Sequence, residues 1–489
     1  MHASPAQPAR RHATLSLAFA CAALAACGGG SDSSAPPAAP APAPVPAPPP
    51  PPAPPAGPSW QAASDVSAGP VDIASPSQLA VNAAGDAVAV WLQTLNTRPS
   101  VWGASFHPGS GWSTPQLLRA SPADAEMPRV GIDALGNAVV VWRDSALSGV
   151  PGQTHAMWSV RGTRNGDGSV SWSSGTKLPA NREALQSYAL AVSPSGTAVL
   201  AWREYFPATG GDTVATRNLA VTEGDGVTWS LPAYPESSDG DVDKPVVAIG
   251  AAGDAALAWE QAGDSGASQV LASRRTGAGS WSAPQLLTVS GGSTTVVSYD
   301  PRVAVAGDGQ ALVVWQQYEG PTRQLWSSRS AAGGNWSTGA ALTAPGVVRR
   351  FTDATLAMNA AGQAVLAWGD VSTSYSQVWT RRYSTAGGWA PNEVQASTDG
   401  LLNQGEQQVA LDSAGRATLM WRGGSGNPHV FARSSDASGQ WLGTPQRIDE
   451  AGSDTTYTPQ VGVDANGNWL AVWSQFTGSL GRLRTSSAK

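Results

Sequence analysis

The chain has 489 residues, of which 41% are hydrophobic and 13% charged, and it contains 55 glycines, 38 prolines and 21 tryptophans. This composition excludes disorder along the whole length and favours short strands and tight turns over long solvated helices. A net charge of -6 argues against a nucleic-acid-binding surface. The two cysteines, Cys21 and Cys27, lie near the N-terminus, so the rest of the chain can hold neither a disulfide nor a cysteine metal cluster.

Residues 1–26 have the pattern of an export signal. Arg10, Arg11 and His12 precede an apolar run over 13–26 that is short for a membrane span. The run ends in Leu24-Ala-Ala-Cys27-Gly28, which resembles the lipobox of bacterial lipoproteins. The resemblance implies a lipid on the Cys27 thiol and a place in the bacterial cell envelope, and Gly28 after the cysteine implies the outer membrane, with the inner membrane as the alternative location. An ordinary signal peptide cleaved after Ala26 is the alternative.

Residues 27–58 are predicted to be a tether. They are rich in Gly and Ser and then in Ala and Pro, a composition that cannot form a core and favours polyproline II. At about 3.1 Å per residue, this segment could hold a domain roughly 70 to 90 Å from its anchor. The folded domain is therefore expected over residues 59–489.

A repeat organises the folded domain. Apolar residues stand ten and twelve positions before a tryptophan, and a glycine stands six positions before it, which predicts a strand, a turn and a second strand. The eight tryptophans of this first marker are Trp91, Trp142, Trp202, Trp259, Trp315, Trp368, Trp421 and Trp473. Their glycines are Gly85, Gly136, Gly196, Gly253, Gly309, Gly362, Gly415 and Gly467.

A second marker, exemplified by Gly111-Trp112-Ser-Thr-Pro, follows each hairpin after one more alternating strand. Its tryptophans are Trp60, Trp112, Trp172, Trp229, Trp281, Trp336, Trp389 and Trp441. Each unit thus holds four strands, here called a to d, and both sets of tryptophans are expected to pack between neighbouring units. Such repeats predict an all-β, eight-bladed β-propeller, with a stacked β-solenoid as the rival fold.

The order of the markers predicts how the ring closes. Trp60 precedes any hairpin, and little chain follows Trp473. Residues 59–68 are therefore expected to supply strand d to the a, b and c strands of residues 459–487, which removes open sheet edges.

Segments before the second marker suggest a family. The runs Ser434–Trp441, Asn165–Trp172 and Thr222–Trp229 resemble degenerate copies of the Asp-box, Ser-x-Asp-x-Gly-x-Thr-Trp, of sialidase-like propellers of the bacterial neuraminidase repeat type. The resemblance implies a propeller with Asp167, Asp225 and Asp436 in the turns between strands c and d. That box is structural, so it implies no catalysis.

No catalytic set is evident in the sequence. A sialidase begins with an Arg-Ile-Pro segment that this chain lacks, and most sialidase propellers have six blades. Other glycosidases need two carboxylates roughly 5 to 10 Å apart, which sequence alone cannot establish across blades. Catalytic residues therefore remain unassigned, and enzymatic activity, if present, would be that of a glycoside hydrolase.

Polar residues flank each a–b hairpin on the side of the b–c and d–a loops. These loops should share one face of the propeller, so the polar side chains are expected to project from that face. They follow the first-marker tryptophans, as Arg143 does, or precede strand a, as Asp353 does. The set comprises Arg143, Asp144, Arg203, Glu204, Glu260, Gln261, Gln316, Gln317, Asp370 and Arg422, and then Arg129, Lys244, Asp300, Arg302, Asp353 and Glu406. With Tyr205, Tyr318 and Tyr375 they could bind a glycan, or they could be a solvated rim of weak ion pairs.

From that set we predict ligand contacts for Arg143, Arg203 and Arg422, which occupy equivalent positions, and for Glu204, Glu260, Asp370 and Tyr205.

No metal site or cofactor is predicted. His107, His155 and His429 are isolated and are expected in loops. Asp133, Asp412 and Asp464 precede turn glycines and are expected to cap the turns, because they lack the neighbouring carboxylates of a calcium site. No Walker or dinucleotide fingerprint occurs.

These observations predict a lipid-anchored, monomeric envelope protein that acts as a binding or scaffold module for a glycan or a protein. A carbohydrate-active enzyme of the sialidase-like group is the alternative, and a structural member of an envelope assembly is a third possibility.

Overall fold

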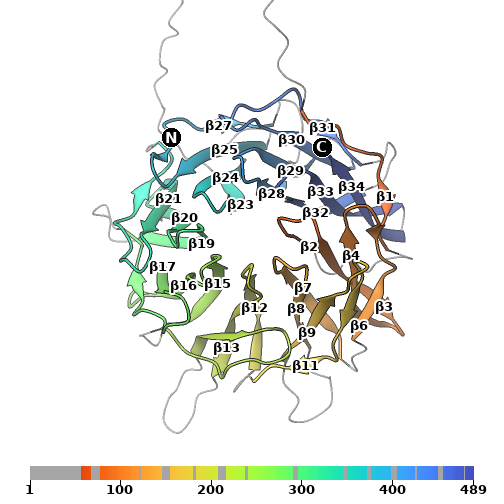
Figure 1. Cartoon of the computed structure of the whole chain (residues 1–489). Helices are drawn as coiled ribbons and strands as arrows, with labels where there is room; N and C mark the ends of the chain where they lie inside the picture. The colour runs from red at the N-terminus through yellow and green to blue at the C-terminus, as the bar shows by residue number, and fades with distance from the viewer. Residues whose placement is uncertain are drawn as a thin grey trace, which may run out of the picture. The chain divides into compact units, whose positions relative to one another are not determined.

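A computed structural model describes residues 57–67, 77–119, 123–145, 155–179, 183–206, 216–236, 240–289, 296–344, 350–371, 376–397, 405–424, 427–449, 455–477 and 480–489. These residues form eight antiparallel sheets arranged as a ring of blades, as Figure 1 shows, and the region around the axis of the ring is called the channel below. The predicted all-β, eight-bladed propeller is confirmed, and the solenoid alternative is wrong. None of the described residues forms a helix able to cross a membrane.

Each blade runs outward from the channel through strands a, b and c to a short strand d. The a strands are β2 (Gln78–Val81), β7 (Ala125–Ile132), β12 (Glu183–Val192), β15 (Val242–Ile249), β19 (Val296–Val305), β23 (Phe351–Met358), β28 (Gly405–Leu411) and β32 (Thr455–Val463). The b strands are β3 (Ala87–Leu95), β8 (Ala138–Asp144), β13 (Ala198–Phe206), β16 (Ala255–Ala262), β20 (Ala311–Glu319), β24 (Gln363–Asp370), β29 (Ala417–Gly423) and β33 (Trp469–Thr477).

The outer strands follow the same order. The c strands are β4 (Arg98–His107), β9 (Ala156–Arg164), β14 (Thr216–Gly224), β17 (Ser268–Arg275), β21 (Thr322–Ser330), β25 (Gln377–Ser384), β30 (His429–Ser434) and β34 (Leu480–Ala488). In four blades strand d is a single short strand, namely β1 (Ser64–Asp65), β18 (Gln285–Leu286), β22 (Ala340–Ala341) or β31 (Gln446–Arg447). In three blades it is split into two pieces, namely β5 (Gly111–Trp112) and β6 (Gln116–Arg119), β10 (Val170–Trp172) and β11 (Thr176–Lys177), or β26 (Gly388–Trp389) and β27 (Val394–Gln395). In the third blade, isolated bridges at Trp229 and Ala233 take its place.

The ring closes through the predicted seam. Strand β1 pairs with β34, so the last sheet has the order β1-β34-β33-β32. Ser64 lies opposite Thr485, and Trp60 bridges to Ala488. The first strand of the folded domain therefore completes the last blade.

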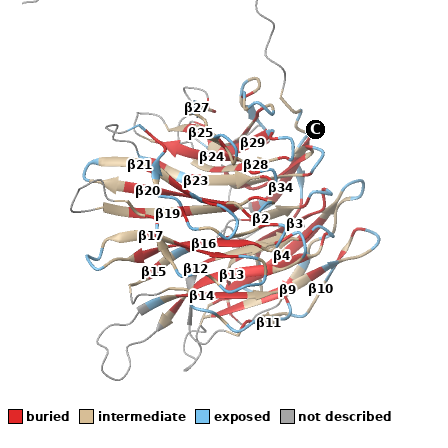
Figure 2. Ribbon diagram, turned by 60° about the vertical axis from the view of Figure 1, so that its left-hand side comes forward, coloured by how far each residue is buried: buried red, intermediate tan, exposed pale blue. Residues whose placement is uncertain are grey.

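The core lies between neighbouring blades, where Figure 2 shows the buried segments. Strand b is apolar on both faces because each face packs on another blade, and Trp202, Trp315 and Trp421 are fully buried there. The second-marker tryptophans lie farther out, and several donate an indole N–H to a hydroxyl of the preceding blade, as Trp229 does to Ser159 at 2.9 Å. Both tryptophan sets thus have the predicted packing role.

The a–b turns have the geometry that the repeat predicts. All eight turn glycines have positive φ, from 75° at Gly362 to 91° at Gly196, which side chains disfavour. Asp133 Oδ1 accepts the N–H groups of Leu135 at 2.9 Å and Asn137 at 2.8 Å. Asp412 and Asp464 accept equivalent bonds, so their predicted capping role is confirmed.

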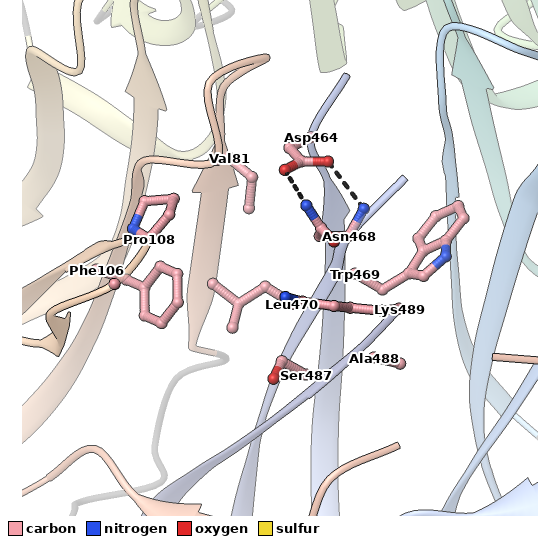
Figure 3. A pocket seen from close by; sticks show the side chains of 12 residues that line it. Val81, Phe106, Pro108, Asp464, Asn468, Trp469, Leu470, Ser487, Ala488 and Lys489 are labelled. Atoms are coloured by element: carbon pink, nitrogen blue, oxygen red, sulfur yellow. Dashed lines mark hydrogen bonds between the residues drawn. The ribbon is translucent and has the colours of Figure 1, made fainter. Parts of the chain in front are cut away.

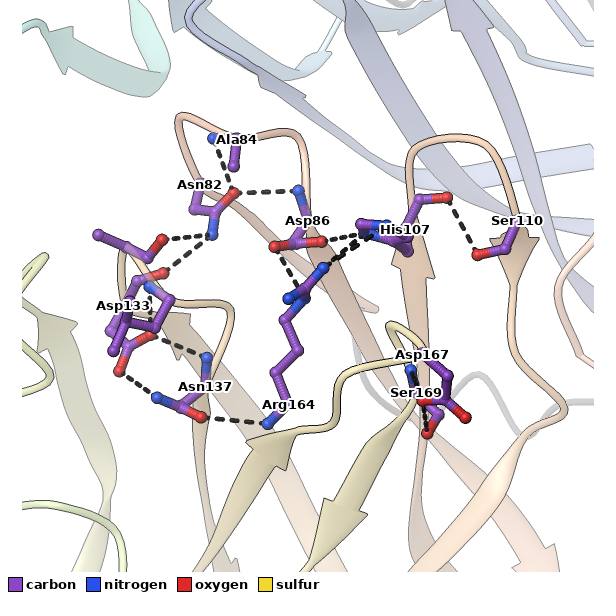
Figure 4. Close-up of polar contacts among 12 residues, drawn as sticks. Asn82, Ala84, Asp86, His107, Ser110, Asp133, Asn137, Arg164, Asp167 and Ser169 are labelled. Atoms are coloured by element: carbon purple, nitrogen blue, oxygen red, sulfur yellow. Dashed lines mark hydrogen bonds and ion pairs between the residues drawn. The ribbon is translucent and has the colours of Figure 1, made fainter.

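The turns also join neighbouring blades. Figure 4 shows Asn82 donating to the carbonyl of Asp133 in the next blade at 3.0 Å. In the same region Asp86 contacts His107 Nδ1 at 2.5 Å and Arg164 Nε at 3.1 Å, and Arg164 belongs to that next blade. Polar side chains on this face are therefore used to hold the ring together.

The proposed signal, lipidated cysteine and most of the tether lie outside the described residues. The boundaries 1–26 and 27–58 remain predictions.

Candidate functional site

In seven of the eight blades, strand a carries a β-bulge on the opposite side of the blade from the a–b turn. At the bulge the register with strand b shifts, for example between Thr352 and Thr355. Six non-glycine residues at this position have φ between 43° and 53°, a strained conformation that structures retain mainly where function or packing requires it. They are Met127, Lys244, Asp300, Asp353, Glu406 and Thr458.

Several bulges are linked from blade to blade by carboxylates. Glu260 Oε1 accepts the N–H of Asp300 at 2.7 Å, and Asp353 Oδ2 accepts that of Glu406 at 3.2 Å. Glu406 Oε2 in turn accepts the N–H of Thr458 at 2.6 Å. These bonds stabilise the strained turns and place a row of polar side chains around the mouth of the channel.

A hollow of about 350 Å³ opens among the bulges. Its lining comes from strand a of five blades, and it includes the first and the fifth, which lie on opposite sides of the ring. The lining residues are Gln78, Arg302, Asp353, Ala354, Thr355, Glu406, Gln407, Gln408, Thr458, Pro459 and Gln460. The hollow therefore lies at the channel mouth and has the size of a small-ligand site.

Arg302 is the cation of this hollow. Its Nε donates to the carbonyl of Ala354 at 2.6 Å, and its Nη1 donates to that of Pro301 at 2.8 Å. Burial lowers the pKa of Arg302, whereas the charges of Asp300 and Asp353 act in the opposite direction. Backbone carbonyls thus orient a guanidinium whose charge is available to a ligand.

The two carboxylates differ in how they are held. Glu406 Oε1 lies 2.9 Å from Arg422 Nη1, and its Oε2 holds the Thr458 N–H, so both of its oxygens are engaged. Asp353 is exposed, and only its Oδ2 accepts a bond from a described residue. Asp353 is therefore the freer acceptor for a ligand.

Two buried polar atoms in the lining have no hydrogen-bond partner among the described residues. Gln407 is 1% exposed, and its Nε2 donates to the carbonyls of Thr352 and Asp353 while its Oε1 has no donor. The hydroxyl of Thr458 is likewise unpartnered. Buried polar atoms normally have partners, so these two favour a hydroxyl-bearing ligand or ordered water in the hollow.

The predicted arginines are found in ion pairs near the channel mouth but do not line the hollow. Arg143 is buried and binds Glu126, with Nε at 3.0 Å from the carboxylate. Arg203 Nη1 lies 2.9 Å from Asp243. Arg422 binds Glu406 and stacks on the Tyr457 ring, with its Cζ 4.6 Å from the ring centre.

The predicted acidic residues have structural partners. Glu204 is fully buried and accepts the N–H of Trp202 at 3.0 Å and the hydroxyl of Tyr234 at 2.8 Å. Glu260 holds the Asp300 N–H and lies 3.3 Å from Lys244 Nζ, and burial raises its pKa. Asp370 is buried at the end of β24.

Of the three tyrosines, Tyr205 is half-buried on β13 and Tyr318 stacks on Tyr299 at 4.8 Å, whereas Tyr375 lies outside the described residues.

Two expectations about location were wrong. The polar residues expected in loops belong to strands, because strand b continues past its tryptophan and strand a begins before its bulge. His107 and His429 also lie in strands, β4 and β30, and each faces an aspartate, Asp86 or Asp449. His155 precedes β9, as expected for a loop residue.

Sequence reasoning missed the glutamines of the hollow. Gln78, Gln408 and Gln460 stand thirteen residues before Trp91, Trp421 and Trp473, where Arg302 also stands relative to Trp315. This position varies among the repeats, whereas the positions one and three residues later are apolar in every copy, and that contrast is a signal in the sequence.

Two other features of the described residues concern metal ligands and the c–d turns. They contain no group of three His, Cys, Asp or Glu side chains that could hold a metal ion. Asp167, Asp225 and Asp436 lie in c–d turns and accept local backbone N–H groups, for example Asp225 from Val227 at 2.9 Å. The resemblance to the Asp-box family remains a prediction.

A second hollow, of about 200 Å³, lies at the seam between the last and first blades, on the side of the a–b turns (Figure 3). Val81, Phe106, Pro108 and Leu470 make it mainly apolar. Among its polar lining residues, Asp464 accepts a hydrogen bond from the side-chain amide of Asn468 at 2.6 Å.

No protein-family profile and no curated protein matches the chain. Among solved structures, it is similar to an α-L-arabinofuranosidase from Fusarium graminearum, at 12% identity over 62% of this chain and 92% of that one, with a TM-score of 0.39. It is also similar to a Hadza microbial sialidase, at 14% identity over 69% and 73%, with a TM-score of 0.38. An ulvan lyase matches at 11% identity over 81% and 97%, with a TM-score of 0.45. Likenesses this weak do not bear on activity.

Proposed function

We propose that the propeller binds a saccharide in the hollow at its channel mouth. The supporting observation is the lining of the hollow, where the amides of Gln78, Gln408 and Gln460 accompany the oriented guanidinium of Arg302. The same lining holds the buried Gln407 Oε1 and Thr458 hydroxyl, which have no partner among the described residues. Sugars present many hydroxyls that both donate and accept, which this mixture satisfies. A single guanidinium also suits a carboxylate-bearing sugar.

Binding can be tested by calorimetry with neutral and uronate-containing oligosaccharides. Gln408→Ala and Gln460→Ala should each weaken binding about fivefold or more, because each removes one hydrogen-bonding amide and disturbs no bond within the described residues. Gln446→Ala, on the exposed outer strand β31, is the matched control. Unchanged affinity in both hollow variants would rule out this site.

A second candidate is glycosidic-bond cleavage at the same place. Asp353 and Glu406 line one hollow from adjacent blades, and paired carboxylates are what glycosidases use. Asp353→Asn should then abolish turnover and leave binding within a few fold. A variant that retains turnover would exclude Asp353 from catalysis.

We further propose, from the N-terminal sequence, that Cys27 carries a lipid that anchors a monomeric propeller in the bacterial envelope, where the partner is a glycan or an envelope protein. Metabolic labelling with a radioactive fatty acid should mark the wild-type protein and not Cys27→Ser. Equal labelling of both would contradict the anchor.

A further inference from the structure

Two surface grooves lie between outer strands of neighbouring blades. One, of about 390 Å³, separates the last blade from the first, and the other, of about 500 Å³, separates the fifth from the sixth. A second-marker tryptophan forms one wall of each, Trp112 in the first and Trp389 in the second. Strands c and d of the preceding blade form the opposite wall.

The two linings correspond position by position. Phe106 pairs with Trp112, and Tyr383 pairs with Trp389. The ring centres are 5.4 and 5.2 Å apart, and both pairs are tilted by 59°.

The hydrogen bonds across the two grooves correspond as well. Trp112 donates its indole N–H to Thr485 at 3.2 Å, and Trp389 donates to Ser327 at 2.9 Å. The bond by itself also joins Trp229 to Ser159 and Trp441 to Thr380, but its combination with an aromatic pair occurs at these two grooves.

The second aromatic ring is not needed to build a blade. In five other blades the residue opposite the marker tryptophan is small, namely Gly162, Gly224, Ser330, Ser435 or Ala488. Between the fourth and fifth blades, protein side chains occupy the equivalent space. There the Arg274 guanidinium lies 5.8 Å from the Trp336 ring, and Gln285 bonds the Trp336 backbone. The blade therefore does not require an aromatic pair at this position. Tyr383 is buried in the core, so the half-buried Trp112 and Trp389 are the rings that both grooves present to a ligand.

The grooves are open and offer neutral polar groups. A Cβ atom added to Gly111 or Gly388, which begin the short strands β5 and β26, would meet nothing within 4 Å. Thr338 lines one groove and Ser487 the other, and neither hydroxyl bonds to another described residue. The one carboxylate, Asp65, lines the first groove and is paired with Arg482 and Arg484, and the one cation, the exposed Arg329, lines the other, so charge is not what the two grooves share.

We propose that both grooves bind uncharged pyranose units of a polysaccharide. A pyranose has an apolar C–H face that packs on an aromatic ring and a rim of hydroxyls that bond to side-chain hydroxyls. This proposal concerns sites other than the channel mouth and does not depend on it. Two equivalent grooves on one propeller could hold one polymer at both points, which raises its apparent affinity.

Affinity electrophoresis of the full-length protein tests this proposal. The gels contain galactomannan, xyloglucan, mixed-linkage β-glucan or dextran, and an alginate gel tests a charged polymer. Ala62→Arg and Thr338→Arg fill the two grooves from equivalent exposed positions, two residues after Trp60 and Trp336. Ala283→Arg, at the same position after Trp281, is the matched control.

At least one neutral polymer should retard the wild-type protein and the control variant. Each groove variant should bind about tenfold more weakly, and the double variant should lose most of the retardation. Retardation by alginate alone, by no polymer, or equally for wild type and double variant would overturn the proposal. Loss of retardation in Arg302→Gln with none in the groove variants would also overturn it and would assign binding to the channel mouth.

Discussion

The two ends of strand a use polar residues in opposite ways. At the a–b turns, residues such as Asn82 and Asp133 recur at one position, and they cap the turn or bind the next blade. At the bulges the side chains differ from blade to blade, from Met127 and Lys244 to Asp353 and Thr458, and the backbone is strained. A repeated polar residue in this ring therefore has a structural role, whereas a position that varies in polarity is where a ligand site can form.

The largest effect is expected at the turns. Asp133→Ala should lower the free energy of unfolding by about 2 to 3 kcal/mol, because it leaves the N–H groups of Leu135 and Asn137 without their acceptor. Urea denaturation measures the change. Asp308→Ala, an exposed turn residue that accepts one bond from the Gln310 backbone, should cost well under half as much. Equal losses would remove the distinction between capped and ordinary turns.

A smaller, pH-dependent effect is expected at Glu236. Burial raises its pKa to about 7, and its Oε2 is buried with no hydrogen-bond partner among the residues that the structure describes. The folded state therefore binds this proton more tightly than the unfolded state. The resulting stabilisation is present below about pH 4.5 and is lost as the pH rises through 7.

Glu236→Gln removes the titrating carboxyl group, so the variant should lose less stability than the wild type between pH 5 and pH 8. Because Glu236 is only partly buried, the difference in the free energy of unfolding should be only about 1 to 2 kcal/mol. Melting temperatures at the two pH values measure this. Asp308→Asn is the control, and an unchanged pH slope in Glu236→Gln would contradict the assignment.

The strain at the bulge can be measured through Thr458. Thr458→Gly should stabilise the protein by about 1 kcal/mol, because glycine tolerates the φ of 53° that a β-branched residue disfavours. The backbone bond to Glu406 is retained. Thr355→Gly, in a regular part of β23, should instead destabilise by a similar amount. Destabilisation by both would show that the bulge is unstrained.

The smallest effect is expected for Arg203→Ala. Its pair with Asp243 is partly solvated, with side-chain exposures of 19% and 46%, so the loss should be about 0 to 1 kcal/mol. Thermal unfolding measures it, and a loss above 2 kcal/mol would place Arg203 with the structural residues of the turns.

The repeat predicted most of the fold because its markers report local geometry. A glycine six residues before a buried tryptophan identifies the hairpin, and the early Trp60 identifies the closing strand. For the site the sequence reports less, since Arg143 and Glu204, which it predicts as ligand contacts, are buried in pairings with Glu126 and Tyr234, and their contact with a ligand stays a prediction. Gln408 and Gln460 gave no such signal individually.

The sequence by itself determined the number of blades, the strands within each and the closure of the ring, because alternation and turn chemistry act over a few residues and recur eight times. Only the tertiary structure decided which polar residues remain available. Arg302 and Asp353 meet Gln78 at the channel mouth only because the ring brings distant blades together. Bonds between neighbouring bulges join residues about fifty positions apart, as where the Asp353 carboxylate accepts the backbone N–H of Glu406.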